Sequence, residues 1–236
     1  MTEFFPRSYR QGGIRYGQLL KNGSNRLKLD FSDGVSICAA PIWELLSNNS
    51  NFDFLDLYEI FGRQGELNVE IGIGNGDFIV HSAHTGGNWL GFEPVKEFFL
   101  KAVKKVKQAE LCNVRLIQFD AEPFVRLLPL NSVHTFYLNF PDPWPKQRHK
   151  KRRLLKSWFI ELLSDRLAKE GRIIVLTDHQ DYAEEILANF KEVKTLASES
   201  IGGYSSQADG YYQTKYFKKF AKCGKLFYFN YKLVDI

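Results

Sequence analysis

The sequence has little cysteine and no membrane-length apolar run. Cys38, Cys112 and Cys223 are the three cysteines of a 236-residue chain, and they lie far apart, without the spacing of zinc ligands or a disulfide framework. We therefore expect no metal site, no disulfide and a reducing, cytoplasmic environment. No apolar run is long enough to span a membrane, and the opening MTEFFPRSYRQGG lacks the apolar core of a signal peptide. We expect no association with a membrane.

The excess positive charge is confined to one short stretch. Residues 146–153 contain six cations: Lys146, Arg148, Lys150, Lys151, Arg152 and Arg153. Removing these six from the net charge of +5 leaves −1, so the rest of the chain is almost balanced. A focused basic patch favours a polyanionic partner such as a nucleic acid.

The chain divides into two regions of different pattern. Residues 1–55 show weak periodicity, and we expect a partly mobile extension there. Residues 56–236 are expected to form one domain, because apolar strands alternate with amphipathic helices from Leu67 onward. Expected strands cover residues 67–74, 89–93, 114–120, 133–140, 171–178 and, as an outer strand, 225–234; expected helices cover 95–110, 121–128, 151–169 and 181–190. This alternation predicts an α/β fold: a mostly parallel sheet with helices on both faces and ligands beyond the carboxyl ends of its strands.

The helix expected over residues 151–169 starts beside the basic stretch. Its apolar residues recur at helical spacing from Leu154 to Leu167, and Gly171 is expected to end it. The six cations would then lie at or before its amino end, where positive charge costs about 0.3–1 kcal/mol per group. That placement favours a site for phosphates. The alternative is a solvated, lysine-rich helix face.

A glycine-rich turn, EIGIGNG, follows the first regular strand. Gly72, Gly74 and Gly76 let the backbone approach a bound nucleotide and turn into the next helix. Asp77 stands where the dinucleotide fingerprint has its third glycine or alanine, which disfavours NAD. The acidic Glu70 before the turn is similar to motif I of the S-adenosylmethionine methyltransferases. An ordinary strand-to-helix turn is the alternative.

Acidic residues also end the next two strands. Glu93 follows the second strand, where a carboxylate can accept hydrogen bonds from both ribose hydroxyls. The pair Asp120-Ala121 follows the third strand, where a fold of this kind meets the adenine. With Glu70, three acidic groups at three successive strand ends predict a methyltransferase-type cofactor site.

The segment FPDPWPKQRHKKRR, residues 140–153, follows the fourth strand. Pro141 and Pro143 fix the backbone on both sides of Asp142, which predicts a rigid carboxylate in the mouth of the site. Trp144 offers a stacking face for a base. The alternative is a proline-stiffened connection without a function.

In this order, EIGIGNG, GFE, FDA, FPDPWPKQRHKKRR, TDHQDY and TKYF closely resemble the bacterial tRNA (guanine-N(7)-)-methyltransferase family, over about residues 56–220. The resemblance implies a Rossmann-like class I fold with a seven-stranded sheet whose seventh strand is antiparallel. It implies S-adenosylmethionine as cofactor, tRNA as partner and methylation of the variable-loop guanine at tRNA position 46. The cofactor residues it implies are Glu70, Gly72, Gly74, Gly76, Glu93, Asp120, Ala121 and Asp142. The implied substrate contacts are Lys146, Arg148, Asp178, Thr214, Lys215, Tyr216 and Phe217, with Asp142 at the catalytic centre.

Phe217 departs from the family pattern. The family ends its last motif as TK-x-E, but Phe217 occupies the acidic position here, so a carboxylate contact to the guanine is missing or comes from another group. Two rival interpretations stay open: a methyltransferase for a small molecule or protein, and a non-catalytic RNA-binding protein. The first leaves the basic stretch unexplained, and the intact Glu70 and glycine turn argue against the second. The sequence does not distinguish a monomer from a homodimer.

Overall fold

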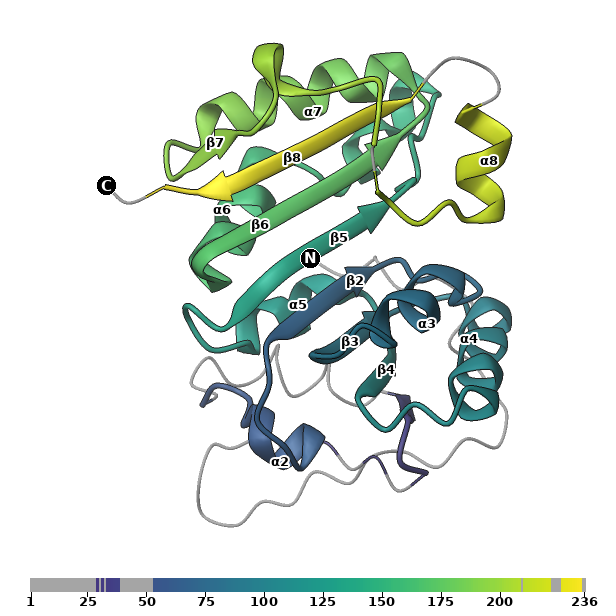
Figure 1. Cartoon of the computed structure of the whole chain (residues 1–236). Coiled ribbons are helices and arrows are strands. Elements are labelled where there is room, and N and C mark those ends of the chain that lie inside the picture. Colours follow the sequence, from purple (N-terminus) through teal and green to yellow (C-terminus); the bar gives the residue numbers. More distant parts are fainter. Residues whose placement is uncertain are drawn as a thin grey trace.

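An eight-stranded sheet forms the centre of the described part of the protein, shown as a computed structural model in Figure 1. The structure describes residues 29, 31, 33–38, 53–208, 210–221 and 226–234. In order across the sheet the strands are β1 (Ser36–Cys38), β4 (Val114–Gln118), β3 (Asn88–Phe92), β2 (Leu67–Ile71), β5 (Val133–Asn139), β6 (Leu167–Thr177), β8 (Phe227–Leu233) and β7 (Leu196–Ser198). The order of the strands reverses between β2 and β5, which is where α/β sheets of this type bind ligands.

The direction of the strands agrees with the expectation, but two details differ. The pairs from β1 to β6 are parallel, whereas β8 is antiparallel to β6 and β7, as the resemblance implied for the last strand. The described sheet has one strand more than the seven expected, because β1, from the region 1–55, pairs with β4. The expectation that residues 225–234 form an outer strand is wrong, since β7 lies outside β8. The boundary proposed at residues 55 and 56 stays a prediction, and most of the first region lies outside the described residues.

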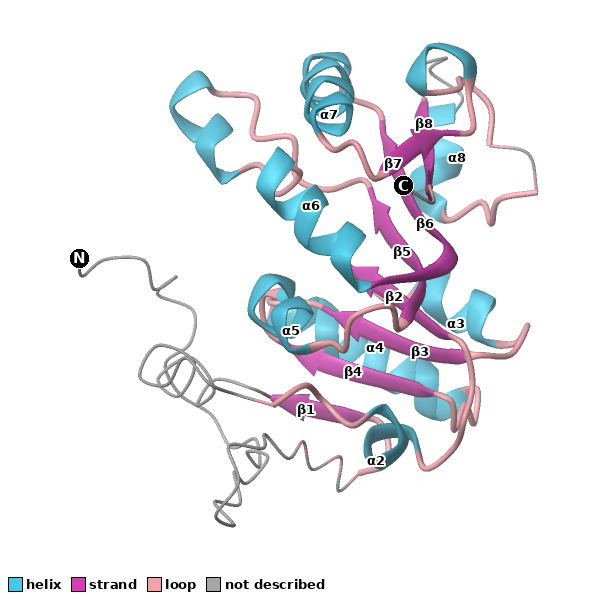
Figure 2. Ribbon diagram, turned by 90° about the vertical axis from the view of Figure 1, so that its left-hand side faces the viewer, coloured by secondary structure: helices cyan, strands magenta, loops and turns pink. Residues whose placement is uncertain are grey.

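Helices cover both faces of the sheet (Figure 2). One face carries α5 (Ala121–Leu127), α6 (Ser157–Arg166) and α7 (Gln180–Glu192), and the other carries α3 (Asp77–Ala83), α4 (Lys96–Gln108) and α8 (Lys215–Ala221). The described part also contains α2 (Leu57–Phe61) and the 3-10 helices η2 (Gln147–Arg152) and η3 (Ile201–Gly203). Among the described residues, no helix has the length and apolarity needed to cross a membrane.

Alternating side chains on the central strands explain the two cores. In β5, Phe136 and Leu138 pack with the helices of the first face, while Tyr137 points to the opposite face. Helix α4 buries the residues expected from its pattern, Phe99, Ala102, Val103 and Val106, but Phe98 is exposed. Because β4, β3, β2 and β5 are neighbouring parallel strands, packing in the two cores aligns their carboxyl ends along one edge of the sheet. The candidate site lies at this edge.

The helix expected over residues 151–169 is wrong at both ends. Its amino-terminal part is the 3-10 helix η2, and α6 begins at Ser157 and ends at Arg166, well before Gly171. Leu167, counted as an apolar helical position, is the first residue of β6. The six cations therefore precede α6 by four or more residues, and the argument from its dipole does not apply to them.

Candidate active site

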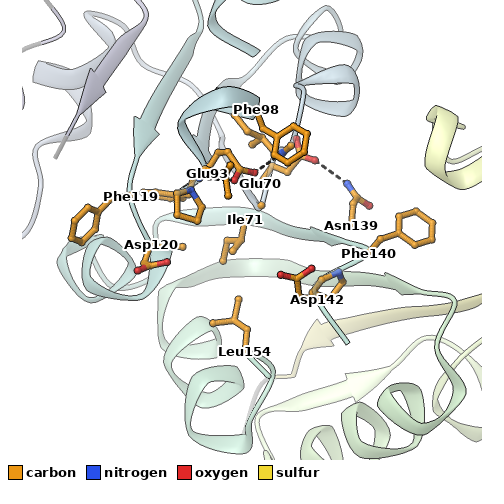
Figure 3. A pocket seen from close by; sticks show the side chains of 18 of the residues that line it. Glu70, Ile71, Glu93, Phe98, Phe119, Asp120, Asn139, Phe140, Asp142 and Leu154 are labelled. Carbon is orange, nitrogen blue, oxygen red and sulfur yellow. Dashed lines mark hydrogen bonds between the residues drawn. The ribbon is translucent and has the colours of Figure 1, made fainter. Parts of the chain in front are cut away.

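One cavity of about 940 Å³ opens at the carboxyl ends of β2, β3, β4 and β5 (Figure 3). Figure 3 shows the carboxylates of Glu93, Asp120 and Asp142 arranged around it. The predicted site residues that line it are Glu70, Gly72, Gly74, Glu93, Asp120, Ala121, Asp142, Thr214 and Tyr216. Within the described residues, those that do not line it are Gly76, Lys146, Arg148, Asp178, Lys215 and Phe217.

The three glycines of the EIGIGNG turn have two different roles, which could not be distinguished from the sequence. Gly72 and Gly74 line the cavity with φ of 79° and 52°, and a Cβ added to either would meet no atom of the described chain within 4 Å. Their bare backbone leaves that space to a ligand. Gly76 instead begins α3, and its added Cβ would lie 2.8 Å from the Cβ of Ala102 in α4. Gly76 thus serves the packing of two helices.

Glu70 lies at the floor of the cavity and is almost completely buried. Burial raises its pKa to about 8, so the carboxyl group is mostly protonated at neutral pH in the free protein. Its Oε1 accepts a hydrogen bond of 3.1 Å from Asn139 Nδ2, while Oε2 has no hydrogen-bond partner within the described part of the chain. A buried polar atom of this kind, on a residue that lines a cavity, fits a cationic or hydrogen-bond-donating ligand.

Two further carboxylates face the same cavity. Glu93 accepts backbone hydrogen bonds from Gly74 and Val95, each of 2.9 Å, which fixes its orientation and ties β3 to the glycine turn. Each carboxylate oxygen keeps acceptor capacity for a ligand hydroxyl. Asp120 is exposed at the end of β4. Although the Asp120 side chain reaches solvent, the surrounding cavity wall partly desolvates it, as it does Glu93, and this raises the pKa of both carboxyl groups. A ligand that donates hydrogen bonds to them would offset the cost of removing them further from water.

The loop that carries Asp142 has an unusual backbone. Phe140 and Trp144 have positive φ values, 52° and 41°, a region that bulky residues rarely adopt. Asp142 lies between them, exposed at the mouth of the cavity and flanked by Pro141 and Pro143. Conformations of this kind persist only where the surroundings enforce them, and they concentrate at functional sites.

Arg153 holds this loop in place. Its side chain is fully buried, with no exposed surface, and its Nε donates a hydrogen bond of 2.7 Å to the carbonyl oxygen of Pro143. The remaining guanidinium nitrogens bind Asp181 and Glu185 of α7. The expectation that Arg153 belongs to a phosphate-binding group is therefore wrong, because two carboxylates already neutralise it.

Lys150 is also paired, since it donates to Asp181 at 2.7 Å. The hydrogen bonds from Lys150 and Arg153 lower the pKa of Asp181 to about 2. Lys146, Arg148 and Arg152 are exposed, and the Arg152 guanidinium lies 5.0 Å from the centre of the Trp144 ring. The basic stretch thus has an inner part, Lys150 and Arg153, whose side chains pair with α7, and an outer part, Lys146, Arg148 and Arg152, whose side chains are exposed to solvent.

The TKYF segment, residues 214–217, contributes to a different part of the cavity wall. Thr214 and Tyr216 line it, and Lys215 is exposed. Phe217 is buried with Ile174, Leu176 and Leu226, and its side chain anchors α8 to the sheet. Asp178, which follows β6, is half-buried.

Several residues around the cavity were not identified from the sequence. Asn139 ends β5 and binds Glu70, and its position directly before the FPDPWP segment could have indicated it. Phe98 and Trp158 add exposed aromatic surface to the lining, but they were assigned to the apolar faces of helices. Tyr211, which donates a hydrogen bond of 2.7 Å to Asn139 Oδ1, has no signal in the sequence. In the described residues, no cluster of three or more His, Cys, Asp or Glu side chains is suited to a metal ion.

The strand order, the glycine turn and the acidic strand ends define the class I fold of S-adenosylmethionine-dependent methyltransferases. An rRNA methylase from Streptococcus thermophilus has the same fold, with a TM-score of 0.52 at 14% identity over 72% of this chain and 88% of that one. Residues 64–229 match the family model described as "Putative methyltransferase".

Two tRNA (guanine-N(7)-)-methyltransferases narrow the class to a family. The protein from Bacillus subtilis is 36% identical over 172 residues, which are 72% of this chain and 81% of that protein. The protein from Thermotoga maritima is 39% identical over 174 residues, which are 72% of this chain but only 55% of that longer protein. The chain belongs to the bacterial tRNA (guanine-N(7)-)-methyltransferase family.

Proposed function

We propose that this protein transfers the methyl group of S-adenosylmethionine to ring nitrogen 7 of the variable-loop guanine, position 46, in tRNA. The observation that carries the proposal is that three carboxylates, Glu93, Asp120 and Asp142, line one cavity from the ends of β3, β4 and β5. The names of the two relatives, both tRNA (guanine-N(7)-)-methyltransferases, support methylation of nitrogen 7 of a guanine in tRNA. The proposed location is the cytoplasm, where tRNA and a reducing environment occur together.

The lining of the cavity fits this cofactor. S-Adenosylmethionine presents an ammonium group, a sulfonium group, a carboxylate, two ribose hydroxyls and an adenine, so that its positive charges outnumber its one negative charge and several of its groups donate hydrogen bonds. Glu70 and the backbone at Gly72 and Gly74 would hold its amino-acid end, because Glu70 Oε2 is buried with no partner in the described chain. Glu93 would accept the ribose hydroxyls, and the Asp120-Ala121 pair would meet the adenine. Gly76 contributes by supporting the turn.

The reaction places modest chemical demands on the protein. The bound cofactor supplies an electrophilic methyl group on a positively charged sulfur. Nitrogen 7 of guanine already carries a lone pair, so no side chain needs to remove a proton before attack. The protein therefore acts mainly by placing this nitrogen in line with the methyl group. Asp142 holds the donor edge of the guanine, assisted by Asp178, and the carboxylates add electrostatic stabilisation.

The tRNA would be bound on both sides of the cavity. Lys146 and Arg148 lie in the exposed outer part of the basic stretch and contact phosphates. On the other side, Thr214, Lys215 and Tyr216 contact the substrate, and the buried Phe217 fixes the segment that carries them. In this arrangement Phe217 supplies apolar anchoring in place of the usual carboxylate contact.

Methyl transfer from labelled S-adenosylmethionine tests the proposal. The purified protein is incubated with tRNA carrying guanine at position 46 and with the same tRNA carrying adenine there. We expect label only in the guanine form. Equal labelling of both would assign the enzyme to another site in RNA. Binding of the cofactor without transfer to any tRNA would support a methyltransferase for a different substrate.

A further inference from the structure

Tyr211 forms the outer end of a short hydrogen-bond chain that leads to the cofactor carboxylate. Its hydroxyl donates to Asn139 Oδ1 at 2.7 Å, and Asn139 Nδ2 donates to Glu70 Oε1 at 3.1 Å. Asn139 is the last residue of β5, whereas Tyr211 lies three residues before Thr214 in the segment that follows η3. Two hydrogen bonds thus join the stretch just before the proposed substrate segment to the proposed cofactor site.

The ring of Tyr211 is fixed independently of its hydroxyl. It stacks on Phe78 of α3, with ring centres 5.1 Å apart and planes at 21°, and it meets Tyr228 of β8 edge-on at 5.7 Å. On the α8 side it lies 6.5 Å from the ring of Phe217. Aromatic packing from three elements therefore sets the position of the ring. Removing the hydroxyl alone would leave this packing in place.

The direction of the chain depends on the state of Glu70. An ionised carboxylate can only accept hydrogen bonds, so Asn139 must present its amino group to Glu70 and its carbonyl oxygen to Tyr211. Tyr211 must then donate. Burial raises the pKa of Tyr211 well above its ordinary value, so its hydroxyl keeps the proton that this requires. The charged Glu70 thereby selects the orientation of Asn139, and the tyrosine hydroxyl stabilises that orientation by donating to Oδ1.

We propose that Tyr211 is a positioning residue whose hydroxyl, through Asn139, couples the substrate segment at residues 214–217 to the cofactor carboxylate Glu70. Bound tRNA then raises the affinity for the cofactor, and bound cofactor raises the affinity for tRNA by the same factor, as thermodynamic linkage requires. This inference rests on the proposed function, because it takes Glu70 as a cofactor residue and Thr214 and Tyr216 as substrate contacts.

The test compares Tyr211→Phe with Tyr212→Phe in the full chain. Tyr212→Phe is a matched control, because it removes the same atom from the neighbouring residue. The ring of Tyr212 stacks on His81, with ring centres 3.8 Å apart, and its hydroxyl is not part of the hydrogen-bond chain to Glu70. Calorimetry measures the dissociation constant of S-adenosylhomocysteine, which cannot react, with and without saturating tRNA. Thermal melting of each variant shows whether the fold is retained.

We expect tRNA to strengthen S-adenosylhomocysteine binding at least about fivefold in the wild type and in Tyr212→Phe. In Tyr211→Phe the strengthening of S-adenosylhomocysteine binding by tRNA should fall to a factor of nearly one. Without tRNA, S-adenosylhomocysteine should bind to this variant about fivefold more weakly than to the wild type, as expected for one lost hydrogen bond. A merely structural role would lower the melting temperature and leave the coupling factor unchanged. An unchanged factor in Tyr211→Phe, or a wild type without coupling, overturns the inference alone. A wild type that binds neither ligand overturns the proposed function as well.

Discussion

The guanidinium of Arg153 donates a hydrogen bond to the carbonyl oxygen of Pro143, 2.7 Å away, and so fixes the residue next to Asp142. Ten residues separate the two in the sequence, and the guanidinium is held from the other side by α7. The loop at the mouth of the cavity is therefore positioned by a buried cation. This contact explains how two positive φ values can persist around Asp142.

Replacing Arg153 with Met should damage both stability and activity. The change leaves the Pro143 carbonyl without its donor, while Glu185 keeps Lys156 and Asp181 keeps Lys150, and an unsatisfied buried acceptor costs about 1–3 kcal/mol. Displacement of Asp142 should lower kcat/KM about 10- to 100-fold, since misplacement by about 1 Å has effects of this size. Urea unfolding and methyl-transfer kinetics measure the two effects. Lys150→Met is the control, because Lys150 pairs with the same Asp181 from a partly exposed position and should cost less than about 1 kcal/mol.

Asp142→Ala should abolish methyl transfer without unfolding the protein. Asp142 is exposed at the mouth of the cavity, so its loss should change the free energy of unfolding by less than about 0.5 kcal/mol. Asp165→Ala, which removes an exposed carboxylate near the far end of α6, should keep full activity. Single-turnover methyl transfer and thermal melting measure both variants. Near-wild-type turnover in Asp142→Ala would remove Asp142 from the mechanism.

The stability of the cofactor-free protein should fall as pH rises through the neutral range. The pKa of Glu70 is raised from its ordinary value of 4.5 to about 8, so between these values the folded protein keeps a proton that the unfolded chain has released. Glu70→Gln carries no such proton and avoids this loss. Its stability relative to wild type should therefore grow from pH 5 to pH 8, by on the order of 3 kcal/mol.

Urea unfolding at pH 5, 6.5 and 8 measures this difference, with the exposed Glu66→Gln as a control whose effect should not vary in the same way. Glu70→Gln should also weaken binding of S-adenosylmethionine. A pH-independent difference between Glu70→Gln and wild type would show that Glu70 is ionised throughout.

Lys146 and Arg148 should contribute to tRNA affinity through charge alone. Both lie in the exposed outer part of the basic stretch. Each Ala replacement should therefore weaken tRNA binding and reduce the magnitude of the slope of log affinity against log salt concentration by about 0.7–0.9. Lys191→Ala is the control, because Lys191 is exposed in the last turn of α7, away from the end of the helix that adjoins the site. Fluorescence titration of labelled tRNA at several salt concentrations gives the slopes. An unchanged slope in both site variants would exclude these phosphate contacts.

The parallel core and the acidic strand ends could be predicted because the evidence for them is local. The strand at Leu67–Ile71 is an unbroken buried run followed by its glycine turn, and Glu93 and Asp120 each directly follow a strand. The strand β1 was missed because three residues, Ser36–Cys38, are too short for any periodicity to show. The short outer strand β7 was missed for the same reason.

The error over residues 151–169 has a different physical cause. Leu154 and Leu155 are apolar because they meet the cavity and the core, and Leu167 belongs to a strand, yet together they have helical spacing. Arg153 could not be distinguished from its cationic neighbours, because its carboxylate partners are 28 and 32 residues away. The hydrogen bond between Tyr211 and Asn139 spans 72 residues, so it too depends on the completed fold.

The most direct test of the central claim is the identity of the methylated nucleoside. Unmodified tRNA is incubated with the full-length protein and S-adenosylmethionine, digested to nucleosides and analysed by mass spectrometry against methylguanosine standards. Cleavage of the intact product at 7-methylguanosine by aniline gives its position in the chain. The account predicts 7-methylguanosine as the product, with cleavage at position 46. Methylation of another atom or another base would contradict it.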